Sequence, residues 1–217
     1  MPEIYLNILE NKRLEVLKQL KFVREFKMYL AGGTALALQL GHRTSVDFDF
    51  YTPQKFKSGK LLPYFLERLG NYNLRVIRDI DNTFELNIND VHLSCFYYPY
   101  KLVDEGKVIV SGVTIATIED VAAMKLVAIT QRGLRRDFVD MYYLLKKFGL
   151  QKILELTGKK YPEFDIYNGL RGLVYFHDAD NDREVSRIEI FDKDFDWSKA
   201  KSLWKGRYLI FKGRVLK

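Results

Sequence analysis

The sequence predicts an α+β protein, with a short mixed sheet flanked by helices and then a mainly helical second half. A strand–helix–strand pattern occupies residues 28–51, and three short strands follow within residues 73–99. From residue 117 onward, helical spacing of apolar residues dominates. These patterns predict a core over residues 1–112 and a helical region with a basic tail over 113–217, although the strand–helix–strand pattern alone also suits an α/β core.

The first 51 residues predict two helices and two short strands. Apolar residues at helical spacing predict a helix over residues 8–27. The stretch "MYLAGG" (28–33) predicts a short apolar strand that ends in two glycines, and residues 34–41 predict a short helix closed by Gly41. Residues 45–51, "SVDFDFY", alternate strictly between apolar and polar side chains, as a half-buried strand does.

The middle of the chain suggests one further helix and a hairpin. Residues 58–69 suit a helix with Ser58 as N-cap and Gly70 as the stop. Of the three strands in residues 73–99, the last two are joined by a hairpin turn at 88–90. Residues 101–112 are expected to form a loop or an edge strand.

The second half begins with two expected helices. Thr117 and Asp120 form a capping-box pattern that opens a helix to about Arg132; Gly133 breaks it, and a second helix follows over 135–148. The C-terminal segment suits either a terminal β-strand or hairpin, which we favour slightly, or a surface for single-stranded RNA. Its aromatic residues are Trp204, Tyr208 and Phe211, and its basic residues are Lys205, Arg207, Lys212 and Arg214.

Composition narrows the class of protein. The formal net charge is +7 and the sequence pI about 9.3, which favours polyanion partners and a generally basic surface about equally. The sequence contains no run of about 18 apolar residues and therefore predicts no membrane span, and its N-terminus does not resemble a secretory signal. The single cysteine, Cys95, excludes an internal disulfide. We expect a cytoplasmic protein without a membrane partner.

Asp47 and Asp49 are the candidate metal ligands. Residues two apart on a strand point to the same face, and two neighbouring carboxylates repel each other unless a cation lies between them. Mg²⁺, or Mn²⁺ in its place, accepts oxygen ligands and commonly binds carboxylates together with substrate phosphates. Gly32 and Gly33 let backbone approach a ligand, and the helix N-terminus after them can hold phosphate. The pattern predicts a triphosphate site; a solvated strand face is the alternative.

Three stretches carry a family resemblance. "GGTALALQLGHRTSVDFDFY" (32–51) resembles the nucleotidyltransferase signature of the AbiEii/AbiGii toxin family, in the DNA polymerase β-like nucleotidyltransferase superfamily. The segment Lys125–Leu145 is similar to the family's Lys-x6-Arg and Asp-x-x-Asp motifs, and Gly172–Asp180 to a recurring C-terminal stretch. The resemblance spans roughly residues 25–200 and implies a polymerase β-like nucleotidyltransferase core.

The resemblance implies roles in the first half of the chain. Gly32, Gly33 and Thr34 would cradle the nucleotide phosphates, and Asp47 and Asp49 would hold Mg²⁺. Arg43 and Ser45 would support this site or bind the nucleotide beside it. Arg43 could pair with Asp49 or with a phosphate. The alternative is a plain surface arginine.

It implies further roles in the second half. Lys125 and Arg132 lie two helical turns apart and would contact the triphosphate. Asp140 would orient Lys125 or act as a general base on the attacking hydroxyl. Asp137, three residues before it, also suits a helix N-terminal acid stabilised by the helix dipole.

One position departs from the superfamily pattern. Many nucleotidyltransferases carry a third metal-binding carboxylate on a later strand, where this sequence has Ser94 and Cys95. Glu85, on the strand before, could substitute. Either two aspartates hold one metal loosely, or the protein binds nucleotide without catalysis; Lys125, Arg132 and Asp140 favour activity.

The resemblance implies an enzyme that moves a nucleotidyl group from an NTP to an acceptor hydroxyl and releases pyrophosphate. The acceptor would be RNA such as tRNA, and the chain would be the toxin of a type IV toxin–antitoxin (abortive infection) system with a cognate antitoxin. The alternatives are an inactive nucleotide- or RNA-binding homologue and a nucleotidyltransferase that modifies protein.

Overall fold

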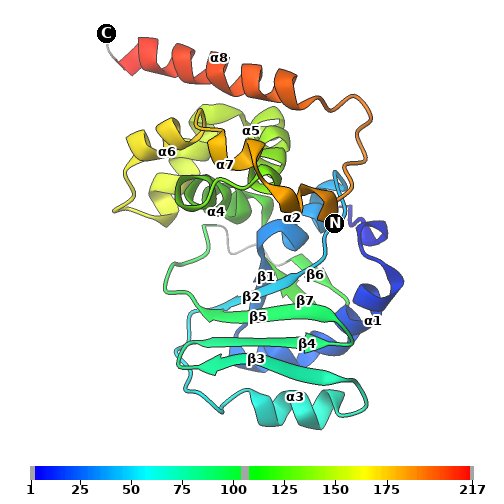
Figure 1. Cartoon of the computed structure of the whole chain (residues 1–217). Helices are drawn as coiled ribbons and strands as arrows, with labels where there is room; N and C mark the ends of the chain where they lie inside the picture. The colour runs from blue at the N-terminus through cyan, green and yellow to red at the C-terminus, as the bar shows by residue number, and fades with distance from the viewer. Residues whose placement is uncertain (1–2, 104–107, 216–217) are drawn as a thin grey trace. The chain divides into compact units, whose positions relative to one another are not determined.

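The fold is that of a computed structural model, which describes residues 3–103 and 108–215 (Figure 1). The chain divides into two compact units, Met1–Ile118 and Glu119–Lys217. Each unit has its own architecture, a sheet in the first and a set of helices in the second. Residues 113–118 lie in the first unit, so the division falls six residues after the expected boundary at 112.

The first unit is built on one mixed sheet with strand order β3-β4-β5-β2-β1-β7-β6. The pairs β2–β5 and β1–β7 are parallel and the others antiparallel, which confirms the α+β class. Figure 1 shows α3 beside the outer strand β3. The elements are η1 (Leu6–Ile8), α1 (Asn11–Gln19), η2 (Leu20–Phe26), β1 (Tyr29–Ala31), α2 (Gly32–Leu40), β2 (Phe48–Thr52), α3 (Leu62–Leu69), β3 (Leu74–Ile80), β4 (Thr83–Ile88), β5 (Val91–Tyr97), β6 (Val108–Val110) and β7 (Val113–Ile115).

The alternation predicted for β2 places its two faces in different surroundings. Phe48 and Phe50 are fully buried, whereas Asp49 and Tyr51 on the other face are half-buried. Such a strand suits a sheet with one face against a core, because successive side chains point to opposite sides. The acidic face is therefore the face that stays accessible.

Several expected elements of this unit are confirmed. Gly41 ends α2 in a left-handed conformation (φ 62°), and the turn between β4 and β5 has positive φ at Asn89 and Asp90, as a type I′ hairpin turn requires. The edge strand expected within residues 101–112 is β6, although residues 104–107 lie outside the described residues.

Two expectations for this unit are wrong in detail. The helix expected over 8–27 becomes a 3-10 helix from Leu20 onward. Ser58 does not cap α3, which begins only at Leu62 with a proline in its first turn. The Ser58 hydroxyl instead donates to the carbonyl of Asp79 at 2.9 Å, so it fastens the preceding turn to β3.

The second unit is helical. Gly133 (φ 52°) separates α4 from α5, and Gly149 (φ 73°, ψ 164°) breaks α5 at the end expected from the sequence. Within the described part of the chain, no helix is long and apolar enough to span a lipid bilayer. The elements are α4 (Ile118–Gln131), which starts one residue before the unit, α5 (Arg135–Lys160), α6 (Ile166–Gly172), α7 (His177–Asp180), η3 (Arg183–Arg187) and α8 (Trp197–Val215).

The strand or hairpin expected at the C-terminus is wrong, because the segment forms α8. The Asp196 carboxylate accepts a hydrogen bond from the Lys199 backbone N–H (2.7 Å), which is an N-cap that the sequence analysis missed. Ala200 and Trp204 lie on one helix face and are both buried. The Trp204 ring lies 5.1 Å from that of Phe138, so helical packing overrode the local alternation.

Replacement of Trp204 by Ala should lower the free energy of unfolding of the second unit by about 3–5 kcal/mol, the usual cost of truncating a buried aromatic side chain. Leu209→Ala is the matched control on the same helix, because Leu209 is 64% exposed and Trp204 only 1%. The control should stay within about 0.5 kcal/mol. Urea denaturation followed by circular dichroism measures both, and equal losses would contradict this packing of α8.

Candidate active site

Asp49 lies at the centre of the sheet. It is in register with Ala31 on β1 and with Ser94 on β5, and Asp47 directly precedes the same strand. Directly opposed residues point to the same face, so the position next to Asp49 on β5 is filled by a hydroxyl, not a carboxylate. Asp49 thus lies on the accessible face of β2, while Asp47 lies in the segment that leads into the strand, because the strand expected from residue 45 begins only at Phe48.

Gly32 allows the backbone to approach the Asp49 carboxylate. It follows β1 directly with a φ of 66°, and a Cβ built on it would lie 3.3 Å from Asp49 Oδ2. A side chain here would meet both a strained backbone and the carboxylate. Gly32 and Gly33 were expected to precede the helix, but they are the first two residues of α2 and form part of its first turn. The backbone N–H groups of that turn have no partner within the helix.

The hydroxyls of Thr34 and Ser45 bind each other rather than standing open to a ligand. Thr34 Oγ1 lies 2.7 Å from Ser45 Oγ and also donates to the backbone carbonyl of Asp47. Because Thr34 has a single hydroxyl hydrogen, Ser45 donates to Thr34. This network ties the first turn of α2 to the segment that carries the aspartates, which makes both residues positioning residues.

Arg43 is a buried residue of the first unit. Its exposed fraction is 2%, so the surface-arginine alternative is wrong. Arg43 Nη1 donates to the carbonyl of Thr44 at 2.8 Å. A buried guanidinium that binds the backbone just before β2 supports the loop that leads to the aspartates.

The strand position of the missing third acid is now defined. Glu85 on β4 is in register with Ser94, so it shares the face of Asp49 but lies two strands away, about 10 Å at normal strand spacing. Its carboxylate lies 3.6 Å from Arg78 Nε and 3.9 Å from His92 Nε2. Burial, with a contribution from the charge of Asp49, raises the pKa of the Cys95 thiol, so no thiolate is available there.

Two carboxylates therefore form the acidic site. Over residues 3–103 and 108–215, no group of three or more His, Cys, Asp and Glu side chains is placed to hold a metal ion. Such a donor set suits a hard cation that takes its remaining ligands from water and substrate phosphates.

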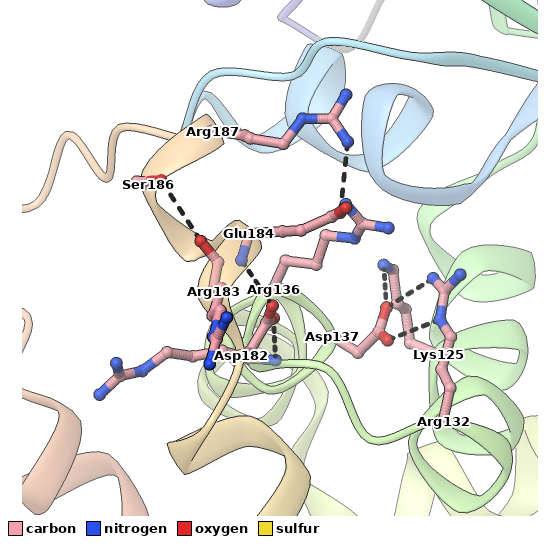
Figure 2. Close-up of polar contacts among 10 residues, drawn as sticks. Lys125, Arg132, Arg136, Asp137, Asp182, Arg183, Glu184, Ser186 and Arg187 are labelled. Carbon is pink, nitrogen blue, oxygen red and sulfur yellow. Dashed lines mark hydrogen bonds and ion pairs between the residues drawn. The ribbon is translucent and has the colours of Figure 1, made fainter.

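The second unit contains a separate charged cluster (Figure 2). Lys125 Nζ on α4 lies 2.9 Å from Asp137 Oδ1 and 2.6 Å from Asp140 Oδ2 on α5. Arg132 donates to both oxygens of Asp137, from Nε at 2.9 Å and from Nη2 at 3.1 Å. Asp137 thus joins the predicted Lys125 and Arg132, and Asp140 contacts Lys125 directly. The sequence alone predicts for Asp137 no more than a helix N-terminal acid.

Exposure separates the two cations of this cluster. The Lys125 side chain is 5% exposed and the Arg132 side chain 50%. Burial alone would raise the pKa of Asp137, but the charges of Lys125 and Arg132 outweigh it and hold the pKa below its ordinary value. Asp137 is thus ionised, and the exposed guanidinium is held in place from beneath by a buried salt bridge.

Comparison with known proteins identifies the family. The family model described as "Nucleotidyl transferase AbiEii toxin, Type IV TA system" matches residues 17–100 and 98–203. The chain belongs to the AbiEii nucleotidyltransferase toxin family. This AbiEii chain is also 36% identical over 201 residues to an uncharacterized protein of Aquifex aeolicus (strain VF5), which covers 90% of this chain and 92% of that protein.

Two solved structures share the fold of this AbiEii protein. One is a protein of H. pylori assigned as a nucleotidyltransferase, with a TM-score of 0.61, 18% identity and 99% of both chains covered. The other is MenT4, a nucleotidyltransferase toxin of Mycobacterium tuberculosis H37Rv, with a TM-score of 0.62 and 15% identity over 90% of this chain and 82% of that one. The protein is accordingly a transferase of the nucleotidyltransferase class, and a type IV toxin family implies an NTP substrate and an antitoxin partner.

Gly32→Ala tests the approach to Asp49. Gly59→Ala is the matched control, because Gly59 has a similar φ of 75° and nothing within 4 Å of an added Cβ. Both variants should lose about 1–2 kcal/mol of stability from the backbone conformation. Only Gly32→Ala should also lower nucleotidyl transfer by about 100-fold, because it displaces the carboxylate. Thermal denaturation and a transfer assay measure the two effects, and equal activities would exclude the contact.

Asp137→Asn tests the charged cluster through its pH dependence. Asp137 has a lower pKa folded than unfolded, so it stabilises the fold above about pH 4, and this contribution is lost as the pH falls through the folded-state pKa. The variant should lose roughly 3–5 kcal/mol at pH 7, and this loss should shrink progressively as the pH is lowered below about 4, as measured by denaturant unfolding. Glu155→Gln, in an exposed pair with Lys152, should cost under about 1 kcal/mol. A loss for Asp137→Asn that does not change with pH would contradict the assigned ion pairs.

Proposed function

We propose that this AbiEii protein is a Mg²⁺-dependent nucleotidyltransferase that moves a nucleotidyl group from an NTP to a hydroxyl of RNA, as the toxin of a type IV toxin–antitoxin system. One observation carries the proposal: the Asp49 carboxylate lies against Gly32 at the first turn of α2. A helix N-terminus attracts phosphate, and a pair of carboxylates attracts a divalent cation. The two features lie side by side in the first unit, where an NTP phosphate chain with its cation needs them.

Asp47 and Asp49 would hold the metal. Both are half-buried, and the remaining oxygen ligands would come from water and the phosphates. Bound there, Mg²⁺ or Mn²⁺ would neutralise phosphate charge and align attacking and leaving oxygens.

The backbone of Gly32 and Gly33 would bind the phosphates. Their N–H groups belong to the first turn of α2, and glycine leaves room for phosphate oxygens. Thr34 and Ser45 would act by fastening this turn to Asp47, and Arg43 by supporting the preceding loop. Nucleotide recognition in the first unit would thus rest on backbone held by buried side chains.

In the transfer step, the acceptor hydroxyl oxygen forms a bond to the α-phosphorus. The bond from that phosphorus to the oxygen bridging to the β-phosphate breaks, pyrophosphate leaves, and the hydroxyl proton is released. Such chemistry depends on positioning and charge stabilisation. Arg132 would supply positive charge to a substrate phosphate, and Lys125, Asp137 and Asp140 would be the residues that position it. The contact at 2.6 Å favours Asp140 orienting Lys125 over Asp140 acting as a general base.

RNA is the proposed acceptor, with tRNA as one example, because the net charge of +7 favours a polyanion. MenT4, which shares the fold, is a nucleotidyltransferase toxin. The proposed cellular setting is the cytoplasm, where tRNA, NTPs and a cognate antitoxin would all be available.

The test is transfer of label from each α-labelled NTP into total RNA and into protein, with Mg²⁺ or with EDTA. We expect label in RNA that requires the divalent cation. The double variant Asp47→Asn, Asp49→Asn should lower it by at least about 100-fold, because the carboxylates hold the charge that aligns the phosphates.

Asp90→Asn is the matched control, since Asp90 is an exposed aspartate in the β4–β5 turn of the same unit, and it should keep full transfer. Label in protein alone would support a protein-modifying transferase. NTP binding without transfer under any condition would support a binding protein. Transfer that survives in the double variant would exclude the assigned carboxylates.

A further inference from the structure

The second unit contains a cavity that the proposed transfer step does not use as a whole. Its volume is about 670 Å³, within the roughly 300–1,000 Å³ range of ligand sites. Its walls come from the end of α4, from α6 and the segment after it, and from α8. The side chains that matter below are Arg132, Asn168, Arg171, Tyr175, Asp178 and Tyr208.

Two guanidinium groups lie in the wall of the cavity, those of Arg132 and Arg171. Arg132 is held by two hydrogen bonds to Asp137, so its planar group is fixed before any ligand arrives. Arg171 comes from the exposed side of α6. Arginine suits phosphate because its fork of donors matches two oxygens. Among the residues that line the wall, two are arginines and one, Asp178, is acidic.

Two tyrosines supply flat surfaces. Tyr175 is 59% exposed although it lines the cavity, and Tyr208 enters the wall from α8. An exposed ring at the rim of a polar cavity offers a face on which a nucleobase can stack. Asn168 and Gln131 add amide groups that can bind the edge of such a base.

Gly172 allows α6 to pack closely against α4 beside the cavity. A Cβ on Gly172 would lie 3.4 Å from Thr130 Cα and 3.4 Å from its hydroxyl oxygen, so α6 packs closely against the last turn of α4. This close packing brings Arg171 and Arg132 to one cavity instead of two separate surfaces.

Charge continues beyond the cavity along α8. Residues 197–210 of this helix include Lys199, Lys205 and Arg207 and no aspartate or glutamate, whereas its Lys201 is paired with Asp180 at 3.0 Å. Fourteen helical residues extend about 20 Å, longer than a single nucleotide. The positive side chains therefore favour a ligand with several successive phosphates over a free mononucleotide.

We propose that this cavity binds an unpaired nucleotide of single-stranded RNA, with its base on Tyr175 and Tyr208, its phosphates on Arg132 and Arg171, and the following phosphates along α8. This inference rests on the proposed function, because it names the part of the acceptor that the enzyme holds. An RNA with a single-stranded end or loop is thus the preferred substrate class.

The experiment measures binding of a 5′-fluorescein-labelled 12-nucleotide oligouridylate to the full chain by fluorescence anisotropy at several salt concentrations. Arg171→Ala should weaken binding and lower the slope of log K against log salt by about 0.7, the value of one phosphate contact on a single strand. Tyr175→Ala should weaken binding by about ten-fold and leave that slope unchanged, because stacking is uncharged.

The controls remove the same groups elsewhere in the unit. Arg183→Ala removes an exposed arginine of η3, and Tyr167→Ala removes a tyrosine of α6 that is 63% exposed; neither lines the cavity. Both should bind the oligonucleotide as the wild type does. Equal effects of cavity and control variants would overturn the proposal, as would displacement of the oligonucleotide by polyglutamate at equal charge, which would indicate an acidic protein ligand.

The double variant Asp47→Asn, Asp49→Asn separates this inference from the proposed function. It should lose transfer and keep oligonucleotide binding. Transfer by the wild type without binding that depends on the cavity would overturn the inference alone. Binding that depends on the cavity, with no transfer by the wild type, would overturn the proposed function alone.

Discussion

The carboxylate of Asp49 must be held close to the N-terminus of α2, and the rest of the first unit depends on this constraint. β1 ends at Ala31, in register with Asp49, and the chain enters α2 at once through the positive φ of Gly32. The missing side chain at Gly32 lets the carboxylate lie against the backbone. Thr34 then ties the helix back to Asp47, so acids and backbone donors form one rigid piece.

The second unit treats charge differently. In its charged cluster, Lys125 is buried between Asp137 and Asp140, whereas Arg132 reaches solvent. A buried salt bridge contributes little net stability but fixes geometry, because removal of one partner leaves the other charge uncompensated. The pairing of Lys125 with Asp137 therefore serves orientation: it holds the carboxylate that fixes the guanidinium of Arg132. Exposure thus divides the family's two basic residues into a contact and a support.

Local patterns predicted much of this molecule. The alternation around Phe48, the turn at Asn89 and the helix breaks at Gly133 and Gly149 all depend on residues adjacent in the chain. The sequence could not show that Asp137 joins Lys125 to Arg132, because that contact requires two helices to meet across a break. The available signal was Asp137 itself, a carboxylate five residues after Arg132 that can accept two hydrogen bonds from one guanidinium. The C-terminal helix was missed because aromatic and basic residues alternate in this segment. That alternation masked the helical spacing of the buried residues Ala200 and Trp204.

The aromatic packing of Trp204 has a consequence for synthesis of the chain. Phe138 and Phe176, whose rings lie 5.1 and 5.7 Å from that of Trp204, leave the ribosome well before it. Their cluster therefore stays open while the intervening residues are translated, and exposed apolar surface of this kind attracts chaperones and proteases. The second unit closes its core only when α8 emerges, so a truncated nascent chain would lack both this core and the Tyr208 wall of the cavity.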